Sequence, residues 1–210
     1  MKVLLVNGSP HPHGCTYTAL GEVANTLAEE GIETEIFQVG IKPIAGCIAC
    51  KTCAKTGQCA FSDRVNDFVG LAKDFDGFVF GSPVHYAAAS GAITSFMDRA
   101  FYSDANSGRQ SFYLKPAAAV VSARRAGTTA AFDQLNKYFT ISEMPVISSR
   151  YWNMVHGATP EDVKKDLEGL QTMRVLARNM AWFLKCKEAG IKTGVPLPVK
   201  EARIYTNFIQ

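Results

Sequence analysis

Four closely spaced cysteines carry the sharpest chemical signal in the sequence. They follow the pattern Cys47-x2-Cys50-x2-Cys53-x5-Cys59. Cysteines spaced by two residues in a loop can turn their sulfurs toward a common centre, and a further cysteine can close the shell. Four thiolates suit a 4Fe–4S cluster or a structural zinc ion.

The spacing of these cysteines bears on which group they hold. Zinc sites more often pair two CxxC units that lie far apart, so the compact triplet with one further cysteine favours the cluster. A metal-free loop of reduced thiols is the remaining alternative. Cys15 and Cys186 have no such partners in the sequence, which predicts that both are packing residues.

A second chemical signal is the run GSPHPHGCT, residues 8–16, which lies between an apolar segment and a helical one. The hydroxyl groups of Ser9 and Thr16, together with the N–H groups at a helix N-terminus, form an anion site of phosphate size. Pro10 and Pro12 stiffen the run but remove two donors. A capped turn without a ligand explains the same pattern about equally well.

Two later loops also carry unusual side chains. In residues 81–91, an aromatic ring and small residues are able to face a planar ligand, although His85 and Tyr86 also suit ordinary surface positions. In residues 122–128, Arg124 and Arg125 are able to meet a phosphate or oppose an anionic ring. Solvated surface charge is the alternative interpretation of the two arginines.

Alternating strands and helices must position these loops. The apolar patterns predict strands at residues 2–6, 33–39, 78–80 and 116–122, with a fifth beginning at 145–148. They predict helices at 16–30, 63–75, 90–101, 128–142 and 160–188. The alternation predicts an α/β fold with a five-stranded parallel sheet and helices on both faces. Right-handed crossovers restrict the strand order, and the order 2-1-3-4-5 of a flavodoxin-like three-layer sandwich is one of the few common solutions, which we adopt. Ligands of such sheets bind at the carboxyl ends of the strands.

Composition and length set the wider limits. The chain has 210 residues, 47% apolar and 20% charged, with a net charge of +3, which is typical of a globular protein and too dispersed for nucleic acid. We expect one domain over residues 1–190 with a cysteine-rich loop at 40–62. We expect a tail over 191–210, including Pro196, Tyr205 and Phe208, that packs on the domain or on a partner subunit. The first residues do not form a signal peptide and no run spans a bilayer, which predicts a cytoplasmic protein without structural disulfides.

Taken together, the loops resemble a known family. The segments KVLLVNGSPHPHGCT, GCIACKTCAKTGQC, GSPVHYAAASGAITSFMDR, VSARRAGTT and RYWN, within about residues 1–152, are similar to the NAD(P)H-dependent FMN reductase and iron–sulfur flavoprotein group of the flavodoxin-like superfamily. The resemblance departs at two positions, because relatives usually have a basic residue and an asparagine where this chain has His11 and Cys15. Phosphate charge would then be met more by backbone dipoles.

The resemblance implies residue roles, but no side-chain nucleophile and no catalytic acid or base. The residues around the FMN phosphate would be Ser9, His11, Cys15 and Thr16. The residues lining the isoalloxazine would be Pro83, Val84, His85 and Tyr86, and those bordering the ring or its polar edge Ser122, Arg124, Arg125 and Gly127. The cluster ligands would be Cys47, Cys50, Cys53 and Cys59.

The resemblance implies an FMN-dependent NAD(P)H oxidoreductase that passes electrons from a nicotinamide to a quinone, flavin or protein acceptor. The alternative is an iron–sulfur flavoprotein electron carrier that uses FMN plus a 4Fe–4S cluster. A zinc-stapled binding module is the weaker alternative. Segments beyond a minimal core, including residues 103–114, suggest a homodimer or homotetramer in which they cover a neighbour's flavin.

Overall fold

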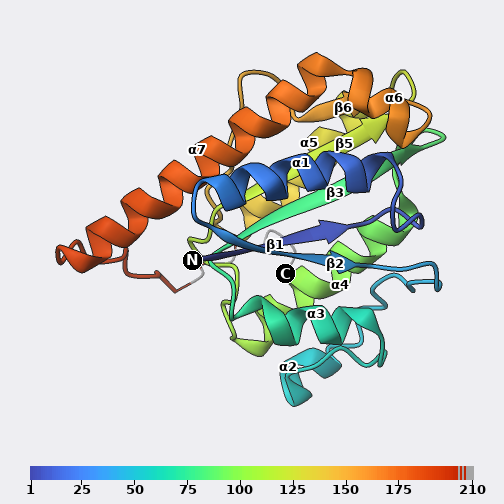
Figure 1. Ribbon diagram of the computed structural model, residues 1–210. Coiled ribbons are helices and arrows are strands. Elements are labelled where there is room, and N and C mark those ends of the chain that lie inside the picture. The colour runs from blue at the N-terminus through green and yellow to red at the C-terminus, as the bar shows by residue number, and fades with distance from the viewer. Residues whose placement is uncertain (203, 205, 207–210) are drawn as a thin grey trace.

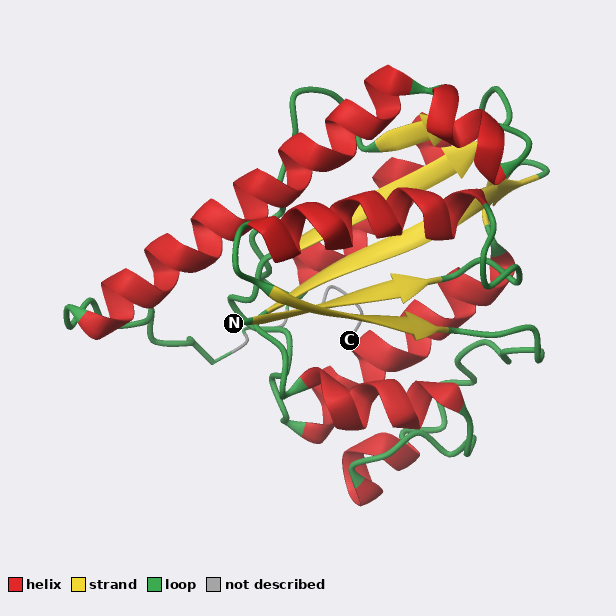
Figure 2. Cartoon of the chain, viewed as in Figure 1, coloured by secondary structure: helices red, strands yellow, loops and turns green. Residues whose placement is uncertain are grey.

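The structure is a computed structural model that describes residues 1–202, 204 and 206. A sheet lies between two layers of helices (Figures 1 and 2). The strands are β1 (Lys2–Asn7), β2 (Glu33–Gln38), β3 (Gly77–His85), β4 (Ala88–Ala89), β5 (Ala117–Ala123) and β6 (Met154–His156). The helices are α1 (Cys15–Glu29), α2 (Thr52–Thr56), α3 (Arg64–Ala72), α4 (Gly91–Ser107), α5 (Thr128–Ile141), α6 (Pro160–Lys165) and α7 (Leu167–Lys192).

The five parallel strands confirm the predicted flavodoxin-like topology. Their order across the sheet is β2-β1-β3-β5-β6, which is 2-1-3-4-5 when the short antiparallel strand β4 is set aside. Their arrowheads point the same way in Figure 2. All five carboxyl ends therefore meet at one edge of the sheet, where ligands of such folds bind.

The apolar side chains of β1 pack alternately into two hydrophobic cores, one on each face of the sheet. Leu4 and Val6 belong to the cluster beneath α3, α4 and α5, whereas Val3 and Leu5 belong to the cluster beneath α1 and α7. Figure 1 shows these helices on opposite faces of the sheet. Because both faces are covered, the strand is apolar throughout instead of alternating.

The predicted end of the third strand was wrong. β3 does not stop at Phe80 but continues to His85, because it pairs with β5 as far as Pro83 and then turns back to pair with β4. The segment expected to be a loop from residue 81 is therefore mostly strand. Its ladder brings Pro83 beside Ser122.

The predicted fifth strand was also misplaced. Of residues 145–148, Val146 forms only an isolated bridge to Ala117, and the regular pairing with β5 is made by β6. The chain leaves the sheet between them and returns at Asn153, whose side-chain amide donates to the Ala119 carbonyl at 3.0 Å. The strand that borders β5 therefore has two parts: an isolated bridge at Val146, and β6, which is longer and lies nearer the carboxyl ends of the strands.

The helix predicted over 160–188 is two helices. The break is at Asp166, whose ψ of 77° is not helical. Its carboxylate accepts from the Gly169 N–H at 2.9 Å, which caps α7, and from the His156 N–H at 2.7 Å, at the end of β6. One side chain thereby accepts hydrogen bonds from a backbone N–H at the start of α7 and from one at the end of β6. In a continuous helix, Asp166 would not be an N-cap residue.

The described part of the tail lies against its own domain. Lys200 forms an ion pair with Glu143 at 3.1 Å, and its ammonium group lies 4.2 Å from the centre of the Tyr113 ring. Tyr205 and Phe208 lie outside the described residues. Within the described chain, no helix is both long enough and apolar enough to cross a membrane.

Candidate functional site

A hollow of about 440 Å³ lies at the edge of the sheet where β1, β3 and β5 end. The three segments singled out in the sequence all contribute to it, the second through the end of β3, together with a segment after β6. The lining residues are Ser9, His11, Gly14, Cys15, Thr16, Pro83, Val84, His85, Ser122, Ala123, Arg124, Gly157, Ala158, Thr159 and Pro160. None of these residues is acidic, so the hollow suits an anionic ligand.

The loop between β1 and α1 is held by a buried amide network. Asn7 donates to Gln38 Oε1 at 2.7 Å and accepts from the Ser9 N–H at 3.1 Å. Gln38 in turn donates to the Ser9 carbonyl at 2.6 Å, and Ser9 Oγ accepts from the His11 N–H at 3.1 Å. The ends of two neighbouring strands therefore fix where Ser9 and His11 stand.

The N-terminus of α1 opens into this hollow without a capping side chain. Its N-cap residue is Gly14, and its first turn contains no acidic residue. The first N–H groups of a helix have no intrahelical acceptor and carry a partial positive charge. Thr16, in the first turn, shares a 2.8 Å hydrogen bond with Ser122 Oγ at the end of β5. The arrangement suits a phosphate group bound by backbone donors and hydroxyls.

Close backbone approach brings the first and second loops together. The Gly8 N–H donates to the Gly81 carbonyl at 2.9 Å, and the Gly8 carbonyl accepts from Ser90 Oγ at 3.0 Å. Ser90 also caps α4 by accepting from the Ile93 N–H. A Cβ on Gly8 would lie 2.7 Å from Ile93 Cβ, so only glycine allows this approach.

Three of the predicted cofactor-binding residues do not line the hollow. Tyr86 is fully exposed with a φ of +56°, and Arg125 is exposed. Gly127 lies behind Val84, where a Cβ would come within 2.9 Å of Val84 Cγ1, and its φ is +90°. It supports the lining instead of forming it.

The sequence interpretation missed residues 157–160. Thr159 caps α6 with a full capping box and Pro160 occupies the first turn, so this loop precedes a helix just as the β1–α1 loop does. The sequence pattern predicted the start of α6 at Pro160. Because the fifth strand was predicted at 145–148, the pattern did not show that β6 ends at His156, directly before this loop. Cys15 connects this segment to α1, because its thiol donates to the Gly157 carbonyl at 3.6 Å. Burial raises the pKa of the Cys15 thiol.

The four spaced cysteines line a separate, small cavity of about 20 Å³. Cys53 is buried and Cys59 half-buried, whereas Cys47 and Cys50 are exposed. Within the described residues, no group of three histidine, cysteine or acidic side chains is gathered tightly enough to hold a metal ion. The four thiols suit a cluster or a zinc ion in kind and number, and all four line the same cavity.

The backbone between these cysteines is strained. Ala49 and Lys51 have φ values of +52° and +58°, in the left-handed region that non-glycine residues rarely adopt. Such strain is found most often at functional sites. None of the six cysteines is joined in a disulfide in the described structure. Cys186, predicted to be a packing residue, is exposed on α7, so that prediction was wrong.

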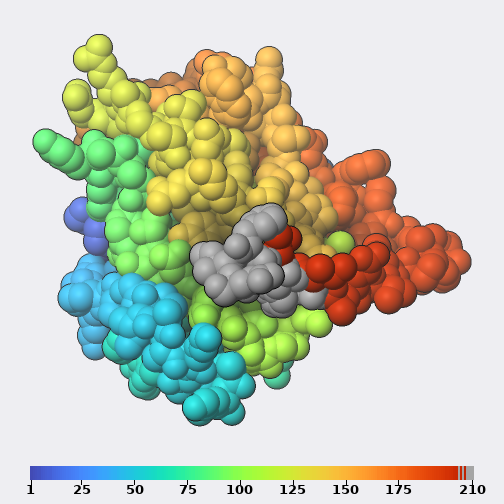
Figure 3. Space-filling view, turned by 180° about the vertical axis from the view of Figure 1, so that it is seen from behind, coloured from blue at the N-terminus to red at the C-terminus, as the bar shows by residue number. Residues whose placement is uncertain are grey.

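The hollow and the cysteine cavity are separate places in the fold. They share no lining residue. In Figure 1, α2 and its flanking loops lie beyond α3, on the outer side of that helix layer. The same segment, in cyan, stands at the lower edge of the molecule in Figure 3.

Comparisons with known proteins agree on a family. The model of the NADPH-dependent FMN reductase family matches residues 1–159. An iron–sulfur flavoprotein of Methanocaldococcus jannaschii is 34% identical over 194 residues, covering 88% of this chain and 98% of that protein. A second iron–sulfur flavoprotein of the same organism is 30% identical over 202 residues, covering 89% of this chain and 98% of that protein.

Solved structures show the same fold at low identity. The structure of RosB with a bound riboflavin phosphate derivative has a TM-score of 0.70 at 13% identity, covering 100% of this chain and 94% of that one. A WrbA-like flavodoxin of Agrobacterium tumefaciens has a TM-score of 0.59 at 14% identity, covering 88% of this chain and 98% of that one.

Proposed function

This chain belongs to the NADPH-dependent FMN reductase family, and from that premise we propose that it is an FMN-dependent NAD(P)H oxidoreductase. FMN binds in the hollow at the strand ends, and electrons pass from a nicotinamide to a quinone, flavin or protein acceptor. The observation that supports this most is that the β1–α1 loop and the carboxyl ends of β3 and β5 meet at one hollow beside the uncapped N-terminus of α1.

The side chains of the hollow suggest how the ligand is held. The first-turn N–H groups of α1, with Ser9 and Thr16, bind the phosphate. Pro83 and Val84, on the extended end of β3, form an apolar wall for the ring system. Arg124 is exposed at the rim, where its positive charge favours an anionic ring edge or an anionic donor.

The bound flavin supplies the hydride and electron transfer, and the chain supplies binding, orientation and charge. The rim residues His85 and Arg124 are exposed, so one side of the hollow is open to solvent and to a second substrate.

Reconstitution of anaerobically purified protein tests the proposal. We expect yellow protein whose flavin absorbance is bleached by NADPH or NADH and returns when an acceptor such as a quinone is added. Protein that fails to take up added FMN would rule out the proposal. FMN uptake without bleaching by either nicotinamide would rule out the reductase reaction while keeping the flavin site.

The second candidate is an iron–sulfur flavoprotein that carries electrons on FMN and a 4Fe–4S cluster. Two observations favour it: all four spaced cysteines line one cavity, and two relatives are named iron–sulfur flavoproteins. Cys47, Cys50, Cys53 and Cys59 would hold the cluster, which supplies one-electron transfer. Soft thiolate ligands in this number fit either the cluster or zinc.

Metal and sulfide analysis decides between these groups. Anaerobic preparation should give about four iron and four sulfide per chain if the cluster is bound. Stoichiometric zinc without sulfide would instead support a zinc-stapled loop. If neither iron nor zinc is found and the protein still oxidises a nicotinamide, only the first proposal, the FMN-dependent reductase, is supported.

A further inference from the structure

Arg99 is the largest fully buried side chain in the described part of the chain, although it carries a charge. It lies on α4 and reaches the wall of the cysteine cavity. Its ion pair with Asp63 has N–O distances of 2.6 and 2.9 Å and joins both carboxylate oxygens. A buried charge is tolerated when it is paired and hydrogen-bonded in this way.

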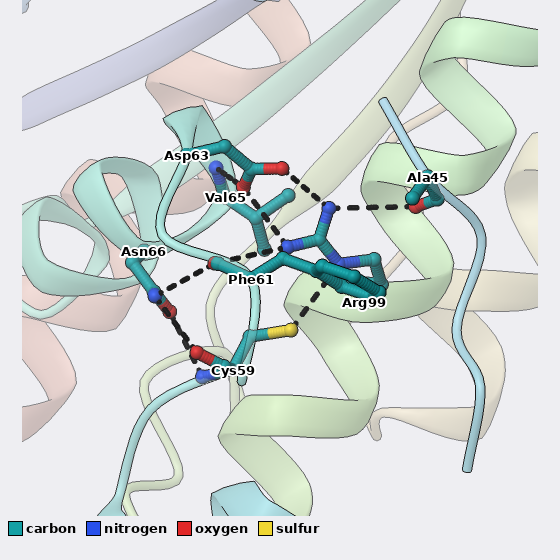
Figure 4. A network of polar contacts seen from close by, with 7 residues as sticks. All are labelled: Ala45, Cys59, Phe61, Asp63, Val65, Asn66 and Arg99. Carbon is teal, nitrogen blue, oxygen red and sulfur yellow. Dashed lines mark hydrogen bonds and ion pairs between the residues drawn. The ribbon is translucent and has the colours of Figure 1, made fainter. Parts of the chain in front are cut away.

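Every N–H group of the Arg99 guanidinium has an acceptor (Figure 4). Its two terminal nitrogens donate to Asp63, to the Ala45 carbonyl at 3.4 Å and to the Phe61 carbonyl at 3.2 Å. The remaining donor, Nε, points at Cys59 Sγ at 3.2 Å. A guanidinium has five donors in a rigid fork, so the contact with the sulfur completes the set.

These acceptors lie on both sides of the cysteines in the sequence. Ala45 precedes Cys47, whereas Phe61 and Asp63 follow Cys59. One side chain therefore holds the two ends of the cysteine loop against α4. Asn66 adds to this at the second end, because its amide accepts from the Cys59 N–H at 2.9 Å and donates to the Cys59 carbonyl at 3.0 Å.

Cys59 is thus set apart from the other three cysteines. Its backbone is fixed by Asn66 and its sulfur by Arg99, whereas the Cys50 sulfur hydrogen-bonds within its own loop to the Thr52 hydroxyl, at 3.3 Å, and Cys47 is exposed. A guanidinium N–H is a far better match for a ligating thiolate than for a neutral thiol, which is a weak acceptor. The local structure is already arranged for Cys59 as a metal ligand.

We infer that Arg99 is a positioning residue of the four-cysteine site, which anchors Cys59 and donates a charge-assisted hydrogen bond to its sulfur when a cluster is bound. This inference rests on the second proposed function, the iron–sulfur flavoprotein. Hydrogen bonds to the sulfurs favour the more negative, reduced cluster, so the Arg99 contact raises the cluster's reduction potential. Mutation of a residue that hydrogen-bonds to a metal ligand typically weakens metal binding by about 10–100-fold.

Two variants separate the hydrogen bond from charge and folding. Arg99→Lys keeps the positive charge but lacks the planar fork needed to serve Asp63 and Cys59 together. The double variant Arg99→Met with Asp63→Asn removes both charges at once, leaves no unpaired buried ion, and keeps an N-cap residue for α3. Lys55→Met, at an exposed position of α2, is the matched control for a charge change in the same loop.

The readouts are cluster reduction potential and the rate of iron loss to a chelator, both measured anaerobically, with the FMN potential of the same sample as an internal reference. We expect both Arg99 variants to lose iron about tenfold faster and to have a lower cluster potential, with the FMN potential unchanged. Lys55→Met should match the wild type. Unchanged potential and iron loss in folded Arg99 variants would overturn the inference and leave the proposed function standing.

A measurement on the wild type covers the case in which both variants fail to fold. Pulsed electron paramagnetic resonance of the reduced cluster, in protein containing isotopically labelled arginine, should show coupling to an arginine nitrogen. Its absence would overturn the inference. Wild-type protein without iron and sulfide, prepared anaerobically, would overturn the cluster itself and the role of Arg99 with it.

Discussion

The hollow at the strand ends and the cysteine cavity are organised by different means. The hollow is built on the ends of buried parallel strands, whose register and backbone hydrogen bonds fix the loops. The cysteine cavity is built on a loop with one short helix, and two of its four sulfurs are exposed. The hollow is fixed by the ends of the strands, whereas in the cysteine cavity the Arg99 side chain holds one of the four sulfurs.

The largest effect that tests this difference is expected from removing one cysteine. Cys59→Ser should abolish most of the iron bound by anaerobically prepared protein, because the anchored ligand is lost, while FMN content stays unchanged because the hollow shares no residue with the cavity. Iron analysis and the flavin absorbance give both values from one sample. Cys186→Ser, at an exposed position on α7, is the control. Loss of FMN along with iron would break the separation of the two regions.

A glycine substitution tests the other region, the hollow at the strand ends. Gly8→Ala places a Cβ 2.7 Å from Ile93 Cβ and 2.8 Å from the Gly81 carbonyl oxygen, so we expect a loss of about 1–3 kcal/mol in the free energy of unfolding and weaker FMN binding. Gly21→Ala, on α1 with nothing within 4 Å of its added Cβ, should be neutral or stabilising by up to about 1 kcal/mol. Denaturant unfolding and FMN titration measure both. Equal FMN affinity in the two variants would contradict a preformed hollow.

The two regions also differ in how far the sequence could predict them. The alternation of strands and helices, together with the usual crossover rule, was enough to suggest the sheet order. The central strands β1, β3 and β5 are buried on both faces and read as apolar runs, whereas the edge strand β2 is partly exposed and alternates. The apolar pattern did not predict the strand ends that are set by long-range pairing. β3 extends to His85 because β5 and β4 pair with it, and β6 pairs with β5 only after the chain has left the sheet and returned. Asp166 splits a helix for a similar reason, because its carboxylate serves a strand end as well as a helix start.

The same contrast applies to the site residues. Spacing alone gathered the four cysteines into one candidate site, and the structure places them around one cavity. Spacing does not reveal Arg99, which is forty residues from Cys59 and meets it only through the packing of α4. Nor did it reveal that Tyr86 is exposed and does not line the hollow, since Tyr86 lies at a hairpin with a positive φ.

A smaller effect is expected from the hydroxyl pair inside the hollow. Thr16→Val removes the hydrogen bond to Ser122 and leaves that buried hydroxyl without its partner, which typically costs about 1 kcal/mol. We expect the FMN dissociation constant to rise about fivefold, measured by flavin fluorescence, with iron content unchanged. Thr18→Val, which also removes a hydroxyl from α1 but lies outside the lining, should bind FMN normally. A loss in Thr18→Val of equal size would point to helix stability instead of the hollow.

The smallest effect concerns Cys15, the cysteine in the lining of the hollow. Burial raises the pKa of its thiol, so the reactive thiolate forms only at a higher pH than in an ordinary cysteine. In flavin-free protein, alkylation of Cys15 by iodoacetamide should therefore be several-fold slower near neutral pH than that of free cysteine, and should keep rising at pH values where free cysteine has levelled off. Peptide mass spectrometry follows each site, with exposed Cys186 as the reference for reagent access. Added FMN should slow Cys15 further and leave Cys186 unaffected, because only Cys15 borders the hollow. If FMN leaves the Cys15 rate unchanged, the flavin does not occupy the space beside α1, and the preformed site must be sought elsewhere along the strand ends.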